Sequence, residues 1–166
     1  MRRFLASLIL LCLLPLGANA HTEDVMWSVH GGLSWGWDDD AFSEFSASDS
    51  LLMLGGGIRW QTEWMPDYLS IQGELGVTAD DGRWREESLD VTYGAGFATL
   101  AYGDRVRLLL RGGVSLVRVD VGGATATDSG LAGGVGLGLP MDDYKLEVHL
   151  TSIDRNINYL GFYWRF

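Results

Sequence analysis

The sequence predicts an all-β fold: an eight-stranded, antiparallel, up-and-down transmembrane β-barrel preceded by a cleaved signal peptide. Three observations predict this fold. Apolar residues alternate with polar or small residues through eight successive segments, and this is the period of strands whose two faces meet different surroundings. Tight and long connections alternate between the segments, as they do in outer-membrane barrels. The first 20 residues have the pattern of an export signal.

The N-terminal segment, residues 1–20, is expected to be removed on export. It has a basic start, a short apolar run and small residues before the cleavage site: Arg2 and Arg3, Phe4 to Leu16, and Ala18-Asn19-Ala20. The apolar run is too short for a membrane-spanning helix. The single cysteine, Cys12, leaves with the signal. We therefore expect residues 21–166 to form one barrel domain that no disulfide stabilises.

The charge of the mature chain limits its partners. The whole chain has 12 basic and 22 acidic side chains, and both Arg2 and Arg3 belong to the signal, so the mature net charge is about −12. This charge argues against nucleic acid as a partner. The sequence contains no phosphate loop, nucleotide motif or metal-ligand cluster, so no cofactor and no metal are expected. The mature chain is expected to be a monomer.

The eight alternating segments follow one another along the mature chain. They are residues 25–36, 52–64, 69–78, 89–97, 106–116, 130–139, 144–151 and 159–166. Each has about the length that a tilted strand needs to cross a bilayer. In each segment the apolar positions are expected to face lipid and the polar or small positions to face the lumen. For the fourth segment this places Leu89, Val91 and Tyr93 on the lipid side, together with Ala95 and Phe97.

The connections predict which end of the barrel faces which compartment. The tight ones are Met65 to Asp67, Gly103-Asp104 and Pro140 to Asp143. The long, polar ones are Asp38 to Ser50, Ala79 to Glu87 and Asp120 to Asp128, and a short one lies near Ile153 to Asn156. Tight turns are typical of the periplasmic end and long loops of the outer end. Most acidic residues fall in the long loops, so the outer surface is expected to be acidic.

Five charged or titratable residues are expected to face the lumen and to form a network there: Arg59, Glu74, Arg111, Glu147 and His149. An eight-stranded barrel is just narrow enough for side chains to fill it. A two-residue turn at Gly103-Asp104 would place Arg111 opposite Gly96, and a turn at Pro140 to Asp143 would place His149 opposite Gly134. Opposing glycines would give the long side chains room. If the register differs, the same charges are merely solvated.

A soluble eight-stranded cup is the alternative architecture for this pattern. In such a lipocalin-like barrel the apolar faces would line a ligand cavity and the polar faces would meet water. The apolar faces here carry bulky leucine, valine and tryptophan, which exceed the volume of a small lumen. The opposite faces carry glycine, serine and charges of both signs. This distribution favours the membrane barrel.

The last nine residues, Asn158 to Phe166, resemble the terminal strand of outer-membrane proteins. Apolar residues alternate toward a final aromatic at Leu160, Phe162, Trp164 and Phe166. The resemblance implies that the barrel-assembly machinery reads these four residues. With the signal peptide and the strand count, the mature chain is similar to the small OmpA/OmpX-like and opacity-porin-like barrels. That resemblance implies the outer membrane of a Gram-negative cell, with outer-membrane lipid and lipopolysaccharide as neighbours.

A narrower resemblance links two segments to PagL-type lipid A deacylases: Gly32 to Asp38, and His149 followed by Thr151 and Ser152. That family uses a Ser-His pair with an acidic partner, the arrangement that makes a hydroxyl nucleophilic. Here Thr151 stands where the family has serine, and no carboxylate occurs near Asn158. The sequence therefore favours a structural or surface-interaction barrel with a side-chain-filled lumen and no catalysis. The alternatives are a deacylase using His149 with Thr151 or Ser152, and a small porin.

Overall fold

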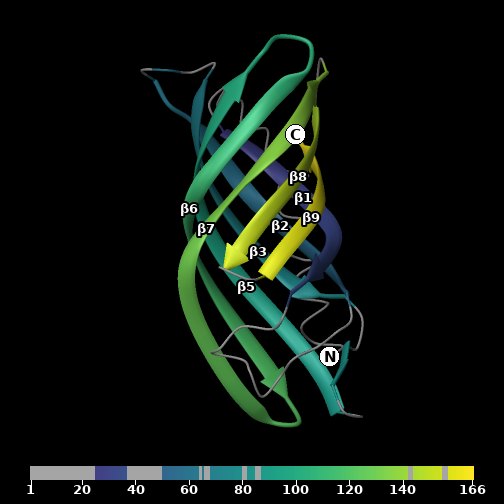
Figure 1. Ribbon diagram of the computed structural model, residues 1–166. Helices are drawn as coiled ribbons and strands as arrows, with labels where there is room; N and C mark the ends of the chain where they lie inside the picture. Colours follow the sequence, from purple (N-terminus) through teal and green to yellow (C-terminus); the bar gives the residue numbers. More distant parts are fainter. Residues whose placement is uncertain are drawn as a thin grey trace.

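Figure 1 shows the computed structural model of the chain, a closed barrel of steeply tilted strands. The structure describes residues 25–36, 50–63, 65, 68–79, 82–84, 87–141, 144–154 and 157–166. The signal peptide, the acidic run at 38–40 and most of the first long loop lie outside the described residues. Within the described part of the chain, no helix is long and apolar enough to cross a membrane.

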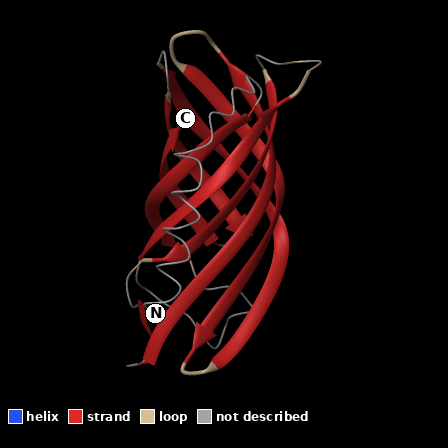
Figure 2. Ribbon diagram, turned by 180° about the vertical axis from the view of Figure 1, so that it is seen from behind, coloured by secondary structure: helices blue, strands red, loops and turns tan. Residues whose placement is uncertain are grey.

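The strands form one antiparallel sheet that closes on itself. They are β1 (Val25–Trp35), β2 (Leu51–Gln61), β3 (Leu69–Thr78), β4 (Gly82–Trp84), β5 (Glu87–Tyr102), β6 (Arg107–Val121), β7 (Ala124–Pro140), β8 (Lys145–Asp154) and β9 (Ile157–Arg165). The first and last strands pair, with Gly31 opposite Phe162, and this pairing closes the wall. Figure 2 shows the same closed wall from behind.

Eight of these strands make the barrel wall. β4 has three residues and pairs with the start of β5, with Gly82 opposite Leu89. β3 pairs directly with β5, with Gly73 opposite Gly96, so β4 is an addition to the connection between them. The predicted eight-stranded, antiparallel, up-and-down barrel is therefore confirmed. Closure leaves the barrel wall without a free edge at mid-height, which is the requirement for strands that cross a bilayer.

The two ends of the barrel differ. We call the end with the connections β2–β3, β5–β6 and β7–β8 the turn end, and the opposite end the loop end. At the loop end, strands β5, β6 and β7 extend well beyond the point where β8 gives way to β9 (Figure 1). Gly133 of β7 pairs with Ser152 of β8, whereas residues 124–132 pair with β6 alone among the described residues.

The predicted long loop from Asp120 to Asp128 is wrong. β6 continues to Val121, β7 begins at Ala124, and a two-residue turn joins them. The turn residues are Gly122 and Gly123, whose φ angles are +53° and +91°. Two consecutive positive φ angles are what a tight hairpin turn needs, and only glycine adopts them without strain. The polar residues of this region therefore belong to a protruding hairpin.

Two predicted registers are also corrected. Tyr102 pairs with Leu108 rather than with Arg105, so Arg111 lies opposite Thr99. The reason is that the connection after β5 is longer than a two-residue turn. At the β7–β8 connection the chain turns between Pro140 and Lys145, and His149 lies opposite Gly136. The facing residue there is still a glycine, shifted by two positions.

The predicted faces hold for every wall strand except β5. Leu54, Leu75, Leu137 and Phe162 are among the large apolar residues exposed on the outer surface, as expected for a lipid-facing wall. In β5 the orientation is the reverse of the prediction. Leu89, Val91 and Tyr93 point into the lumen and are at most 2% exposed, and Phe97 is also buried. The reason lies in the filling of the lumen, described below.

Candidate functional site

The lumen of the barrel holds the residues from which any function of the interior must come. The five residues expected to form a network all lie inside the barrel and are buried: Arg59, Glu74, Arg111, Glu147 and His149. They come from β2, β3, β6 and β8. Each points inward because it occupies the parity opposite to the lipid-facing leucines of its own strand.

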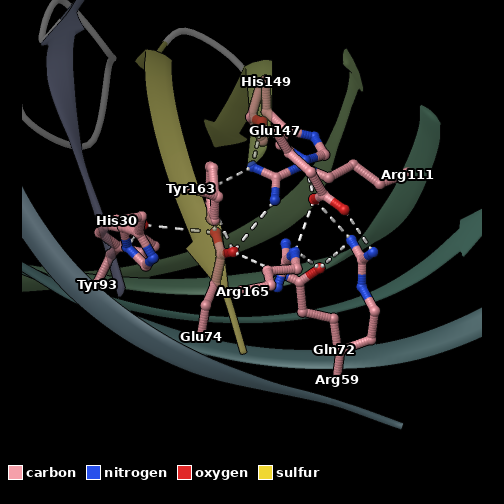
Figure 3. A network of polar contacts seen from close by, with 11 residues as sticks. His30, Arg59, Gln72, Glu74, Tyr93, Arg111, Glu147, His149, Tyr163 and Arg165 are labelled. Atoms are coloured by element: carbon pink, nitrogen blue, oxygen red, sulfur yellow. Dashed lines mark hydrogen bonds and ion pairs between the residues drawn. The ribbon is translucent and has the colours of Figure 1, made fainter. Parts of the chain in front are cut away.

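Glu147 is the centre of the first cluster (Figure 3). Its Oε1 accepts a hydrogen bond from Arg59 Nη1 at 2.7 Å, and its Oε2 accepts from Arg59 Nη2 at 3.0 Å. The two bonds make a bidentate ion pair, the strongest form of arginine–carboxylate contact. Oε2 also accepts from Arg165 Nε at 2.7 Å and lies 2.8 Å from His149 Nε2. Both carboxylate oxygens are thus fully engaged.

Glu74 is the centre of the second cluster. Arg111 Nη1 donates to Glu74 Oε2 at 3.1 Å, and the side chains of this pair are fully buried. Gln72 Nε2 donates to the same oxygen at 2.7 Å, and Tyr163 OH donates at 3.3 Å. Tyr93 OH reaches Glu74 Oε1 at 3.4 Å. A buried carboxylate with a cation and several donors is well compensated for its loss of water.

Gln72 joins the two clusters into one network. Its Oε1 accepts hydrogen bonds from Arg59 Nη2 at 3.2 Å and from Arg165 Nη2 at 3.1 Å, while its Nε2 donates to Glu74. Arg111 extends the network to β8 by donating from Nε to Thr151 Oγ1 at 2.8 Å. Side chains from β2, β3, β6, β8 and β9 therefore connect across the full width of the lumen.

Sequence reasoning missed several members of this network: Gln72, Arg165, Tyr163, Tyr93 and His30. Gln72 and Arg165 alternate with the outward-facing apolar residues of their strands, and this alternation is the signal in the sequence that places them in the lumen. Arg165 is not evident as a network residue in the sequence because it lies within the terminal strand motif, between Trp164 and Phe166. His30 Nε2 lies 3.0 Å from Tyr93 OH, which links β1 to β5.

Glycine makes room for the large lumen side chains at specific positions. A Cβ added at Gly76 would lie 2.2 Å from Cε1 of Tyr93, and one added at Gly136 would lie 2.6 Å from Nδ1 of His149. Neither distance is possible for real atoms. Tyr93 and His149 are therefore accommodated because the facing strand carries no side chain at these places.

The loop end of the lumen is filled by apolar side chains. We call these residues the apolar plug: Leu51, Met53, Leu89, Val91, Tyr93, Val117, Val119, Val121, Ile153, Ile157, Tyr159 and Tyr163. Tyr93 and Tyr163 belong to the plug and the polar network at once, because their rings pack in the plug and their hydroxyls reach Glu74. The plug explains the inward orientation of Leu89, Val91 and Tyr93, since these positions of β5 supply part of it. Phe97 lies outside the plug and packs against the guanidinium of Arg111 in the lumen.

Two of the three residues named for a deacylase, His149 and Thr151, also lie in the lumen. His149 and Thr151 are completely buried, and Ser152 is on the opposite parity of β8. His149 Nε2 contacts Glu147, so a histidine–carboxylate pair exists at a position that the sequence motif did not indicate. Thr151 Oγ1 is engaged by Arg111. A nucleophile must meet its base and also reach the substrate, and these side chains face the interior rather than the lipid.

The terminal strand closes the barrel, and its alternating apolar residues lie on the outer face. Leu160 is half-buried, whereas Phe162, Trp164 and Phe166 are exposed. The backbone N and O of Phe166 bond to O and N of Trp27 at 2.9 Å and 2.8 Å. Phe166 is therefore the last residue held by the seam between β1 and β9.

Polar groups lie on the outer face of the protruding hairpin. Arg118 donates to Asp120 from Nε at 3.0 Å and from Nη2 at 3.2 Å, and the Arg118 side chain is 58% exposed. The hydrogen bond from Arg118, together with one from the Thr125 hydroxyl, lowers the pKa of the Asp120 carboxyl. Such an exposed pair contributes little to stability.

No group of three or more histidine, cysteine, aspartate or glutamate side chains in the described residues is placed to hold a metal ion. The polar network consists of arginines, carboxylates, an amide, histidines and tyrosines that bond to one another. Among the described residues, four buried nitrogens of this network have no hydrogen-bond partner: His30 Nδ1, Arg59 Nε, His149 Nδ1 and Arg165 Nη1. The carboxylate oxygens of Glu74 and Glu147 and the hydroxyl of Thr151 accept hydrogen bonds from neighbouring arginines.

The closed antiparallel wall, its apolar outer belt and its filled lumen define the architecture of a small outer-membrane β-barrel. Neither a protein-family model nor a curated protein sequence matches the chain. Solved structures of such barrels do match, among them the three that follow. Neisserial surface protein A is 12% identical with a TM-score of 0.58, over 85% of this chain and 94% of its own.

The other two structures agree with the first. The N-terminal β-barrel domain of Pseudomonas aeruginosa OprF is 11% identical with a TM-score of 0.54, covering 85% of this chain and 97% of that domain. The attachment invasion locus protein Ail of Yersinia pestis, in complex with the heparin analogue sucrose octasulfate, is 13% identical with a TM-score of 0.51, over 86% and 97% of the two chains. The fold of small outer-membrane barrels is thus shared over nearly the whole length.

Proposed function

We propose that this protein is a monomeric outer-membrane barrel with a closed lumen, which acts as a structural or surface-interaction protein and performs no catalysis. This proposal rests on the side chains that fill the lumen. The polar network occupies the half toward the turn end, and the apolar plug occupies the half toward the loop end. A passage for solutes would have to break both layers.

The proposed location rests on three features. The predicted signal peptide would export the chain, and the terminal strand would be read by the barrel-assembly machinery. The belt of exposed leucine, valine and phenylalanine on the wall suits contact with outer-membrane lipid. The turn end would face the periplasm, and the loop end would face outward among the lipopolysaccharide headgroups.

The surface role rests on the loop end. Strands β5, β6 and β7 extend past the rest of the wall (Figure 1). The outer face of β5 and β6 there carries Asp90, Thr92, Arg118 and Asp120. A polar, solvated face on a paired hairpin is suited to contacts with external molecules rather than with lipid. The acidic long loops predicted from the sequence would add negative charge around it.

Two experiments separate this proposal from its alternatives. In a planar bilayer, the purified barrel should show no steady conductance, while its heat-dependent shift on a detergent gel confirms that the sample is folded. Large, stable channels would mean that the protein is a small porin. In cells, the protein should fractionate with the outer membrane, and recovery as a soluble periplasmic species would contradict the proposed location.

The deacylase alternative is favoured by one observation, the 2.8 Å contact between His149 Nε2 and Glu147 Oε2. Burial of His149 and the engagement of Thr151 by Arg111 oppose it. We expect the mass spectrum of lipid A from expressing cells to be unchanged. Loss of one acyl chain, abolished by His149→Ala but not by Arg118→Ala, would establish the enzyme instead.

A further inference from the structure

A small cavity lies inside the barrel at the turn end. Its volume is about 20 Å³, and its charged lining comes from Arg59, Arg107, Lys145 and Glu147. Arg107 and Glu147 border the space next to Gly138, where an added Cβ would lie 3.8 Å from Cβ of Arg107 and 3.5 Å from Cγ of Glu147. A cavity of this size exceeds the ~10–15 Å³ that one water needs.

Among the described residues, positive charge exceeds negative charge in the part of the lumen toward the turn end. Five inward-facing side chains of the described wall are cationic: Arg59, Arg107, Arg111, Lys145 and Arg165. In the wall strands between the turn end and the apolar plug, two inward-facing side chains are carboxylates: Glu74 and Glu147. Arg111 is paired with Glu74, while Arg59 and Arg165 share Glu147 with His149. Among the described residues, no carboxylate forms an ion pair with Arg107 or Lys145 within 4.0 Å.

Donor groups without acceptors lie at the same place. The Nε atoms of Arg59 and Arg107 are buried and have no hydrogen-bond partner among the described residues, and both residues line the cavity. Arg59 is 5% exposed, so bulk water does not reach most of it. A guanidinium group only donates. The missing partner of these groups must therefore be an acceptor, and the excess of positive charge favours one that is negative.

We propose that this cavity binds a small inorganic anion of the size of chloride, held by Arg107 and Lys145 with the Nε of Arg59 as an additional donor. The size of the cavity selects a monatomic ion over an organic anion. The anion supplies the negative charge that the two carboxylates cannot, and it joins β2, β6 and β8 at the turn end. The anion would thereby complete the polar network at the turn end of the barrel.

The test compares thermal unfolding of the folded, detergent-solubilised protein in sodium chloride and in sodium gluconate at equal ionic strength. Equal ionic strength keeps general charge screening constant, and gluconate is too large for the cavity. When chloride is several times above its dissociation constant, the unfolding midpoint should be higher in chloride by roughly 2–4 °C. Equal midpoints in the two salts would overturn the proposal.

Two variants locate the effect. Lys145→Gln, at the half-buried mouth, should abolish the difference between chloride and gluconate, and Arg107→Gln should do the same. Arg118→Gln, which removes an exposed and ion-paired arginine on the protruding hairpin, should retain it. The chloride NMR line width supplies a second measurement on the native fold, since it should broaden with the unmodified protein and not with Lys145→Gln. A chloride effect that persists in both lumen variants would show that the ion binds elsewhere.

Discussion

Replacement of Arg111 by alanine is the sharpest test of the polar network. Arg111 donates to Glu74 at 3.1 Å, to Tyr163 OH at 3.1 Å and to Thr151 through Nε at 2.8 Å. Its guanidinium carbon also lies 4.3 Å from the ring centroid of Phe97. The substitution would remove all of these contacts from side chains that have no exposure to solvent.

The magnitude follows from what remains after the change. Glu74 would keep the amide of Gln72 and the hydroxyls of Tyr163 and Tyr93, but it would lose its only cationic hydrogen-bond donor among the described residues. Removing one member of a buried ion pair typically costs ~3–5 kcal/mol, because the remaining charge is uncompensated. The space left by Arg111 admits water, which lowers the cost, so we expect a loss of about 3 kcal/mol or somewhat less in unfolding free energy.

Urea unfolding in lipid vesicles, followed by tryptophan fluorescence, measures this loss. Arg118→Ala is the matched control, since it removes the same side chain from an exposed position and should have little effect. The double variant Arg111→Ala with Glu74→Gln should be less destabilised than Arg111→Ala alone, because no uncompensated charge is left. Equal tolerance of Arg111→Ala and Arg118→Ala would refute the reasoning and indicate a water-filled interior.

Two further predictions concern assembly and packing. Deletion of Phe166 removes the two backbone hydrogen bonds to Trp27 and the final aromatic residue of the terminal strand. Immunoblots should therefore show less protein in the outer membrane, while export across the inner membrane continues. An unchanged amount would contradict the assembly role. Gly76→Ala places a methyl group against the buried Tyr93 ring and should cost about 1–3 kcal/mol in urea unfolding, whereas Gly112→Ala, with open space at its Cβ position, should be tolerated.

The closed barrel could be predicted from the sequence because its signal is repeated in every strand. One face of each wall strand must meet lipid along most of its length, and a period of two in apolar residues is the direct consequence of that requirement. The inward position of Arg59, Glu74 and Glu147 follows from the same period, since parity alone decides the face. No knowledge of the register is needed for either conclusion.

Contacts inside the lumen could not be predicted in the same way. Whether Arg111 meets Glu74 depends on register, and register depends on the length of each connection. The β5–β6 connection is longer than the assumed two-residue turn, so Arg111 lies opposite Thr99. The role of Gln72 as a bridge depends on the relative heights of three strands. Periodicity along one strand contains none of this information.

The reversed orientation of β5 has a physical cause that extends to the whole loop end. The predicted faces of β5 require apolar residues to point outward all along the strand, but Leu89 and Val91 lie beyond the height of the outward leucines of β6. Phe97 lies within that height, opposite Gly113, and points inward because its ring packs against the guanidinium of Arg111. Beyond the bilayer the outer surface meets water, and the sheet buries its apolar side against the barrel interior as a soluble sheet does. Leu89 and Val91 therefore point inward, while Asp90 points outward.

Strand β6 shows that this change of polarity is visible in the sequence itself. Its outward positions are apolar up to Leu116 and then become Arg118 and Asp120, whereas its inward positions change from Ser115 to Val117 and continue as valine. Every second residue of a strand stays on the same face of the sheet, so this exchange of apolar and polar residues between the two faces does not mean that the strand has turned over. It marks the height at which the surroundings change from lipid to water. In the proposed orientation, the outer boundary of the bilayer would cross β6 between Leu116 and Arg118, and the residues beyond it would form the part of the barrel presented to the outside.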